Sequence, residues 1–383
     1  PGKSPNRSNP HSVGIGIHRS SRWPATNSST HPYSRHLADI KYPITYRPNA
    51  LHNHSIDVVA PHSAFPIFQT YYLCHPTTEM NLVKIVIGSR GSKLALTQTH
   101  WIRDRLLATN DNLEIDVLEI RTTGDSATGS LRSFGGTGVF TKELERALLD
   151  GEIDLAIHSL KDLPTSLHPE LALIATPERE DVRDALIGPD LSSLADLPLG
   201  ARIGTGSLRR QAQLKALRPD LEILDIRGNL DTRIDKAMRG ECEAVILAVA
   251  GLNRLGWQQR IGVVLTLDQV LPAPGQGALG LQMRADNPLQ THLASLNHPA
   301  SQAAVQAERQ LLQTLRAGCH APVGAWSRLE GEKLVLDGLV GDPEGTQLLR
   351  ASQAAPIAEA ESLGETVADA LRSQGADALL QDK

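Results

Sequence analysis

The sequence predicts an α/β protein with two strand–helix blocks followed by a small α+β domain. Short apolar segments typical of buried strands alternate with segments of helical spacing over residues 82–158, and this alternation returns over residues 201–249. From residue 301 a long helix precedes two strand-like segments and another helix. With 383 residues, the chain is long enough for two or three domains around sizeable cores.

The first block opens with an apolar strand and an amphipathic helix, in which Leu96, Ile102 and Leu106 are among the residues spaced to form a buried face. The expected elements are a strand at 82–88, a helix at 92–108, a strand at 113–121, a helix at 139–149 and a strand at 153–158. Residues 124–138 are rich in Gly, Ser and Thr without a period, which predicts a mobile loop.

The remaining elements follow the same rules, although no internal sequence repeat is visible. The Pro/Gly-rich segment 271–280 is placed to carry the chain back to the first block. The expected strands are 201–204, 221–226, 244–249, 333–339 and 348–351, and the expected helices are 208–217, 232–239, 301–315 and 358–373.

Composition excludes several classes of protein. The net charge is −5 and 40% of residues are hydrophobic, as in ordinary globular proteins. No apolar run approaches the roughly 20 residues of a membrane span, and no Lys/Arg block suggests nucleic-acid binding. Three widely spaced cysteines without a CxxC motif argue against a disulfide framework or a zinc site, and favour a reducing compartment.

Residues 1–79 differ from the rest. They hold all five tyrosines and eight of the 14 histidines, with seven basic and three acidic residues, and they lack periodicity, which predicts disorder. One interpretation is an over-extended reading frame with Met80 as the true start, and it implies a cytoplasmic protein. The other is an organelle transit peptide, which is also acid-poor and Ser-rich and would imply a plastid.

Arginines recur at strand-to-helix junctions. Arg90 precedes a helix start, Arg209 and Arg210 lie in the first turn of a helix, and Arg227 and Arg233 flank the start of the next. Ligands of open α/β sheets bind at such junctions, where helix N-termini present free N–H groups and arginine adds a planar fork. The pattern predicts an anion site, for phosphate or carboxylate. The alternative is that these arginines reach solvent or a nearby aspartate.

A polar cluster, HSLKDLP, ends the buried strand at His158. Lys161 and Asp162 are adjacent, and a carboxylate in a cleft beside cations can act as a general acid/base or stabilise a developing cation. An ordinary surface pair at the strand end is the alternative. His158 itself is expected to be a structural histidine.

Cys319 lies in a turn of small residues and proline, where a thiol is accessible. His320 is expected to lower its pKa and raise its nucleophilicity. The alternative is an inert small hydrophobe. Cys242 lies among acids, which disfavour a thiolate, and Cys74 lies in the N-terminal stretch.

These clusters resemble motifs of the porphobilinogen deaminase (hydroxymethylbilane synthase) family. The likeness runs from about residue 83 to the C-terminus, and its most specific motifs are HSLKDLPT, SLRRQAQL, IRGN, LPAPGQGALG and RAGCHAPVGA. The resemblance implies three domains, at 80–178 with 278–297, at 179–277 and at 298–383. The first two would resemble type-II periplasmic binding proteins around a central cleft, and the third would be the small α+β domain with the cofactor cysteine.

The resemblance also implies the reaction. A dipyrromethane cofactor would be joined by a thioether to Cys319. Four porphobilinogen units would be added head to tail, each with loss of ammonia, and water would release hydroxymethylbilane for haem and other tetrapyrroles. Asp162 would be the catalytic aspartate, which helps the amine leave and stabilises positive charge on the pyrrole nitrogen.

The resemblance also implies binding residues by motif match. It implies that the anions bound at the predicted site are the acetate and propionate groups of the pyrroles. The implied cofactor-binding residues are Lys161, Asp162, Ser207, Arg209, Arg210, Arg227 and Gly228, and the implied substrate-binding residues are Arg90, Ser92, Arg233 and Arg254. Porphobilinogen is the expected partner, with no metal, nucleic acid or membrane, and a monomer is the expected form.

The sequence departs from the family pattern in three places. Gly206 replaces a common Ser or Thr, Thr137 replaces a common Lys, and Arg316-Ala317 replaces a more usual Glu-Gly. These departures affect details of binding and loop closure. The alternative function is a non-catalytic two-domain carboxylate-binding protein, which would bind reversibly and form no covalent adduct.

Overall fold

The computed structural model describes residues 82–122 and 141–381. The predicted disorder of residues 1–79, the predicted loop at 124–138, Cys74 and Thr137 lie outside the described residues. No helix within the described ranges combines the length and the apolar character that a membrane crossing requires.

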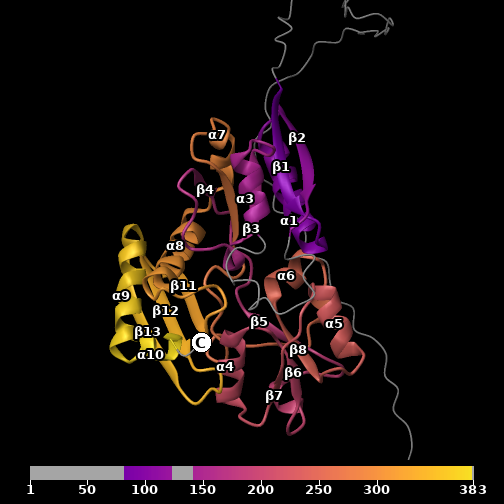
Figure 1. The fold of residues 1–383 in the computed structure, drawn as a ribbon, viewed down its shortest axis with the longest axis vertical. Helices are drawn as coiled ribbons and strands as arrows, with labels where there is room; N and C mark the ends of the chain where they lie inside the picture. Colours follow the sequence, from indigo (N-terminus) through magenta and orange to yellow (C-terminus); the bar gives the residue numbers. More distant parts are fainter. Residues whose placement is uncertain (1–81, 123–140, 382–383) are drawn as a thin grey trace, which may run out of the picture. The chain divides into compact units, whose positions relative to one another are not determined.

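The first sheet combines three strands of the first predicted block with two strands from outside both blocks, one of which follows the second block in the chain (Figure 1). Its strands, in spatial order, are β2 (Leu113–Ile120), β1 (Val83–Arg90), β3 (Leu155–Ser159), β10 (Leu279–Arg284) and β4 (Leu171–Ala175). β1 runs parallel to β2 and β3, whereas β10 is antiparallel to β3 and β4. The helical segments of this part are α1 (Lys93–Thr109), η2 (Leu160–Asp162), α3 (Lys142–Leu149), α7 (Gln290–Leu293) and η5 (Ala294–Leu296).

The second sheet has the same plan. Its strands, in spatial order, are β7 (Glu222–Leu224), β6 (Arg202–Gly204), β8 (Ala244–Ala248), β5 (Asp184–Ile187) and β9 (Val263–Val264). β6 is parallel to β7 and β8, and β5 is antiparallel to β8. The helical segments are η3 (Leu194–Asp196), α4 (Leu208–Leu217), α5 (Leu230–Met238), α6 (Val249–Arg254) and η4 (Gln258–Arg260).

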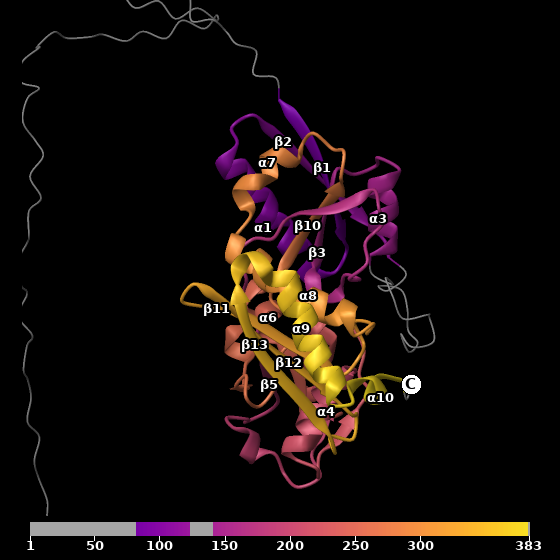
Figure 2. The same cartoon turned by 90° about the vertical axis from the view of Figure 1, so that its left-hand side faces the viewer.

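The C-terminal part is an antiparallel sheet covered by two long helices (Figure 2). It consists of β11 (Val323–Glu330), β12 (Lys333–Gly341), β13 (Leu348–Pro356), α8 (Pro299–Thr314), η6 (Ile357–Glu359), α9 (Ala360–Ser373) and α10 (Ala376–Gln381). Leu311 of α8 and Val367 of α9 pack on the sheet so closely that a Cβ at Gly338 would lie 2.8 and 2.7 Å from their side chains. Glycine is therefore required there for close packing of helices on the sheet.

The α/β prediction is confirmed by these three sheets. In each of the first two, a central strand lies between two parallel neighbours, β1 between β2 and β3 and β6 between β7 and β8, and the next strand across, β10 or β5, is antiparallel. Because β1, β3, β6, β7 and β8 are parallel within their sheets, their carboxyl ends gather at one edge of each sheet, where ligands of α/β proteins bind. The predicted return of segment 271–280 to the first block is also confirmed, since β10 pairs with β3 and β4. The domain boundaries remain a prediction.

Candidate active site

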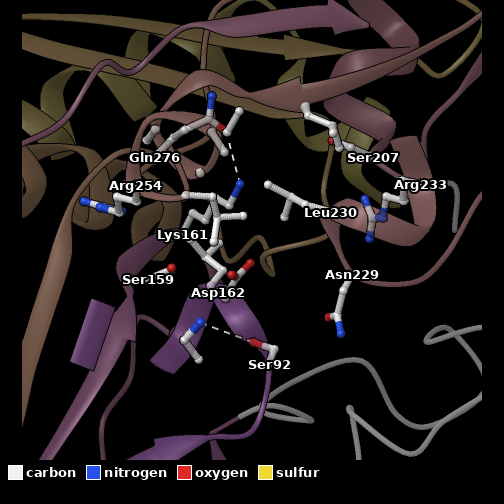
Figure 3. A pocket seen from close by; sticks show the side chains of 18 of the residues that line it. Ser92, Ser159, Lys161, Asp162, Ser207, Asn229, Leu230, Arg233, Arg254 and Gln276 are labelled. Carbon is white, nitrogen blue, oxygen red and sulfur yellow. Dashed lines mark hydrogen bonds between the residues drawn. The ribbon is translucent and has the colours of Figure 1, made fainter. Parts of the chain in front are cut away.

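One cavity of about 380 Å³ is lined by every site residue that the sequence predicted. Figure 3 shows part of its wall, with Lys161, Asp162 and Arg233 among the labelled side chains. It is lined by residues of both strand–helix sheets and by the turn after α8. The predicted residues along its wall are Arg90, Ser92, Lys161, Asp162, Ser207, Arg209, Arg210, Arg227, Gly228, Arg233, Arg254 and Cys319. The structure therefore brings the predicted residues together at one cavity, and their roles stay predictions.

Strand ends and helix starts position most of these side chains. Ser92 follows β1 and caps α1, accepting a hydrogen bond from the Ala95 amide at 3.3 Å. Ser207 follows β6 and caps α4 in the same way, with the Arg210 amide at 3.4 Å. Neither helix carries an acidic residue in its first turn, so the positive ends of both helix dipoles lie at the cavity without a carboxylate on the same helix.

Asp162 and Lys161 occupy the 3-10 turn η2 directly after β3. Asp162 is exposed to the cavity, and its carboxylate points into it beside Lys161 in Figure 3. Lys161 is half-buried, and its Nζ donates to Gln276 Oε1 at 3.5 Å. Burial lowers the pKa of Lys161 to about 8, and neighbouring Asp162 only partly offsets this. The Lys161 ammonium therefore lies next to the Asp162 carboxylate in surroundings that disfavour its positive charge.

Arg209 and Arg210 already have an anion. Both pair with the fully buried Asp184, at 2.9 and 2.7 Å, and each also donates to a backbone carbonyl, of Leu271 and Ile246 respectively. Burial alone would raise the pKa of the Asp184 carboxyl, but the two guanidinium groups outweigh it and hold that pKa well below its usual range. The alternative of a nearby aspartate is therefore realised for this pair, although both arginines still line the cavity.

Arg233 and Arg254 differ from that pair. Arg233 Nε donates to the Gly228 carbonyl and Arg254 Nη2 to the Gly277 carbonyl, each at 2.7 Å. Neither forms a salt bridge within residues 82–122 and 141–381. Burial lowers the pKa of each to about 10. A cation that is desolvated without a carboxylate partner is a position that an anionic ligand would stabilise.

Arg227 is intermediate between these two cases. It pairs with Asp225 at 3.1 Å, and that carboxylate is about half exposed. A Cβ at Gly206 would lie 2.7 Å from Asp225 Oδ1 and 2.9 Å from Arg227 Cζ. The missing hydroxyl at position 206 therefore leaves space that this ion pair now occupies.

Cys319 lies at the same cavity. The thiol is half-buried, and Sγ lies 3.9 Å from the carbonyl oxygen of Leu163, the residue after Asp162. Burial raises the pKa of the thiol, Asp162 raises it further, and Arg309 lowers it. The cation that lowers this pKa is Arg309 on α8, and the expectation that His320 also lowers it stays a prediction.

Two connecting groups were missed by the sequence analysis. Gln276, fully buried in the Pro/Gly-rich segment, donates to Asp184 Oδ1 at 2.9 Å and accepts from Lys161, so it joins the two strand–helix sheets. Glu308 on α8 binds Arg179 with both oxygens, at 2.7 and 2.9 Å, and also accepts from the Gly275 amide. Only an acid within an otherwise apolar helix face signalled Glu308, and nothing distinguished Gln276.

The donor set fits a ligand with several carboxylates. Lys161, Arg233 and Arg254 offer charge without a carboxylate partner that satisfies them, two helix N-termini face the same space, and the thiol of Cys319 is at its edge. A dipyrromethane with four acidic side chains and one thioether bond is chemically compatible with this set.

Comparison with known proteins identifies the family. Residues 85–291 match the family described as porphobilinogen deaminase, dipyromethane cofactor binding domain, and residues 302–373 match porphobilinogen deaminase, C-terminal domain. The chain is 46% identical over 303 residues to the porphobilinogen deaminase of Gloeobacter violaceus, covering 77% of this chain and 92% of that protein. It is 45% identical over 298 residues to that of Roseiflexus castenholzii, covering 77% and 98%.

Among solved structures, the methionine-binding protein MetQ is similar with a TM-score of 0.38 and 10% identity, over 56% of this chain and 89% of that one. That likeness is too distant to bear on function. The two family matches together span well over half of the sequence, and the two relatives are covered almost completely. The chain belongs to the porphobilinogen deaminase family.

Proposed function

We propose that this chain condenses four porphobilinogen molecules head to tail into hydroxymethylbilane, releasing one ammonia for each, as a transferase of tetrapyrrole biosynthesis. The proposal rests on one observation: Asp162 and Cys319 line the same cavity as three cations that lack a carboxylate partner among the described residues. These cations are Lys161, Arg233 and Arg254. Porphobilinogen brings two carboxylates and one aminomethyl group, which match the cations and the aspartate respectively.

Lys161, Arg233 and Arg254 bind carboxylates of the pyrroles in this proposal. Each gains a partner that offsets its desolvation, so binding energy comes from groups that the free protein leaves unsatisfied. Arg90 and Arg227, together with the helix starts at Ser92 and Ser207, complete the set. Arg209 and Arg210 contribute their positive field, while Asp184 fixes their positions.

Asp162 acts on the reacting atoms. Its carboxylate lies in a cavity dominated by positive charge, where positive charge that develops on the pyrrole ring would otherwise be disfavoured. By stabilising that charge as the C–N bond breaks, and by accepting a hydrogen bond from the departing amine, Asp162 lowers the barrier to loss of ammonia.

Cys319 is the proposed attachment point of the dipyrromethane cofactor. The cofactor would supply the pyrrole α-carbon to which new units are added. The protein's part is to hold it by the thioether and by cations next to Asp162, which Cys319 Sγ approaches through the carbonyl of Leu163. We further propose that the protein is a monomer of the cytoplasm, with a plastid as the alternative if residues 1–79 are a transit peptide.

The test combines intact-protein mass with turnover. The purified full chain should exceed its sequence mass by one dipyrromethane, peptide mapping should place the excess on Cys319, and Cys319→Ser should abolish it. Added porphobilinogen should give hydroxymethylbilane and ammonia. An active chain without an adduct would overturn the attachment. Reversible carboxylate binding without an adduct or turnover would favour the non-catalytic alternative instead.

A further inference from the structure

Arg309 is a cation that the proposed reaction does not use. It extends from α8, is half-buried, and forms no salt bridge within the part of the chain that the structure describes. Its Nη1 donates to the Leu163 carbonyl at 3.0 Å and its Nη2 to the Pro164 carbonyl at 2.6 Å. Burial lowers the pKa of this guanidinium, so the position costs free energy that its carbonyl contacts only partly recover.

Arg309 and Cys319 meet on the same backbone oxygen. The carbonyl of Leu163 accepts from Arg309 Nη1 and lies 3.9 Å from Cys319 Sγ. This carbonyl belongs to the turn that carries Asp162, so one guanidinium both fixes that turn and lies beside the thiol. The charged side chains that influence the thiol are Asp162 and Arg309, with opposite effects, and His320 is its neighbour in sequence.

We propose that Arg309 is the residue that activates Cys319 for attachment of the first pyrrole, by stabilising its thiolate. The proposal rests on the proposed function, which makes Cys319 the attachment point. Burial and the carboxylate of Asp162 both oppose ionisation of the thiol, so without a nearby positive charge it would react slowly. Arg309 supplies that charge, and the thiolate is the anionic partner that Arg309 otherwise lacks.

The attachment step balances with this assignment. The Sγ electron pair forms a bond to the methylene carbon of the pyrrole, the bond from that carbon to the leaving amine breaks, and the thiol proton leaves with the amine as ammonia. Once the thioether has formed, the sulfur is neutral. Arg309 then keeps only its carbonyl contacts, and its remaining task is to position the turn of Asp162.

The experiment measures thiol ionisation, not turnover. The full chain is made by cell-free translation without porphobilinogen, so that Cys319 stays unmodified. Its alkylation by iodoacetamide is followed against pH by peptide mapping. Cys242, which is buried in the core beside the second sheet, is the internal reference. In Arg309→Gln, the inflection for Cys319 should move up by about one pH unit and the rate at pH 7 should fall about tenfold, while Cys242 is unchanged.

Two variants separate charge from architecture. Arg309→Lys keeps the charge and should stay closer to wild type than Arg309→Gln does. Arg218→Gln is the matched control, because Arg218 also donates to several backbone carbonyls, of Leu194, Leu197 and Pro198. It pairs with Asp220 and does not line the cavity. It should leave the Cys319 inflection unchanged.

If Arg309→Gln does not fold, citrulline at position 309 removes the charge and keeps most of the N–H donors. An unchanged inflection in a folded neutral variant would overturn the proposal, and so would an equal shift in Arg309→Lys. These outcomes are independent of the proposed function. Failure of wild type to acquire a dipyrromethane when porphobilinogen is added would refute the function, whereas the alkylation profiles would still report on Arg309.

Discussion

Two aspartates, one from each strand–helix sheet, have opposite surroundings. Asp162 follows β3 of the first sheet and is exposed to the cavity, whereas Asp184 begins β5 of the second and is fully buried between Arg209 and Arg210. Gln276 connects them, because it donates to Asp184 and accepts from Lys161, the neighbour of Asp162. An aspartate that is exposed to the cavity, such as Asp162, can therefore act on a ligand. An aspartate that is enclosed by arginines, such as Asp184, stabilises the fold instead.

The comparison predicts the largest effect for Asp162→Asn. Turnover should fall by roughly 10²–10⁴-fold, because the neutral amide cannot stabilise positive charge on the pyrrole as the amine leaves. The free energy of unfolding should change little, since Asp162 is exposed. Single-turnover kinetics and denaturant unfolding check both parts. Near-normal turnover, with the cofactor present by mass, would remove Asp162 from the reaction.

Asp184→Asn should act on the fold instead. It leaves two buried guanidinium groups without their carboxylate, and breaking a buried ion pair costs roughly 3–5 kcal/mol of unfolding free energy. Denaturant unfolding measures the loss. Asp225→Asn is the matched control, because its partner Arg227 is more exposed and the pair should be worth less than about 1 kcal/mol.

Acid should abolish the difference between wild type and Asp184→Asn. The folded-state pKa of Asp184 is depressed below its ordinary value of 3.8, so its stabilisation is complete above that value and is lost as pH falls through the folded pKa. The gap in unfolding free energy between the two proteins should therefore narrow below about pH 4. A gap that stayed constant under acid would mean that the Asp184 charge does not stabilise the fold.

The sequence predicted the position of this site better than its electrostatics. Arg90, Asp162 and Arg233 were located because strand ends followed by helix starts are visible in the hydrophobic pattern, and parallel strands bring such ends together. The pairing of Arg209 with Asp184 was not predictable, because 25 residues and a different strand separate them. Sequence spacing gives the faces of elements, whereas ion pairs depend on how those elements pack.

The fold shows the same limit. The helix 208–217 was predicted with its exact bounds, because an N-cap serine opens it and Pro219 follows it. The strands β5 and β10, the antiparallel strands inside the two main sheets, were missed. Each is a short apolar segment within a stretch of loops, and its partner strands lie far away in sequence. Helix α6 was also missed, since its apolar residues continue directly from β8 without a polar boundary.

Lys161, which is adjacent to Asp162 and donates to Gln276, should give a smaller effect that depends on pH. Its pKa in the folded, ligand-free protein is about 8 instead of 10.5, so its charge is lost as pH rises through 8. Since carboxylates bind the protonated form, the KM for porphobilinogen should rise with pH above about 8, towards tenfold per pH unit. Lys161→Arg should remove that rise, whatever its effect on KM at neutral pH. A wild-type KM that is flat from pH 7 to 9.5 would contradict this assignment.

Gly206→Ser should have the smallest effect. It tests whether the partly exposed side chains of Asp225 and Arg227 can move. The new Cβ would lie 2.7 Å from Asp225 Oδ1 and 2.9 Å from Arg227 Cζ, but both atoms are at the ends of flexible, partly exposed side chains that can shift. KM should change by less than about threefold and unfolding free energy by less than about 1 kcal/mol.

The matched control for Gly206→Ser is Gly204→Ser, two residues earlier in β6. Its Cβ would lie 2.6 Å from Ile226 Cδ1 and 3.1 Å from Val245 Cγ1, inside the core where nothing can move freely. That variant should lose about 1–3 kcal/mol of unfolding free energy. Equal losses in the two variants would show that Asp225 and Arg227 are as rigid as the core, and Arg227 would then belong with the fixed cations at Asp184.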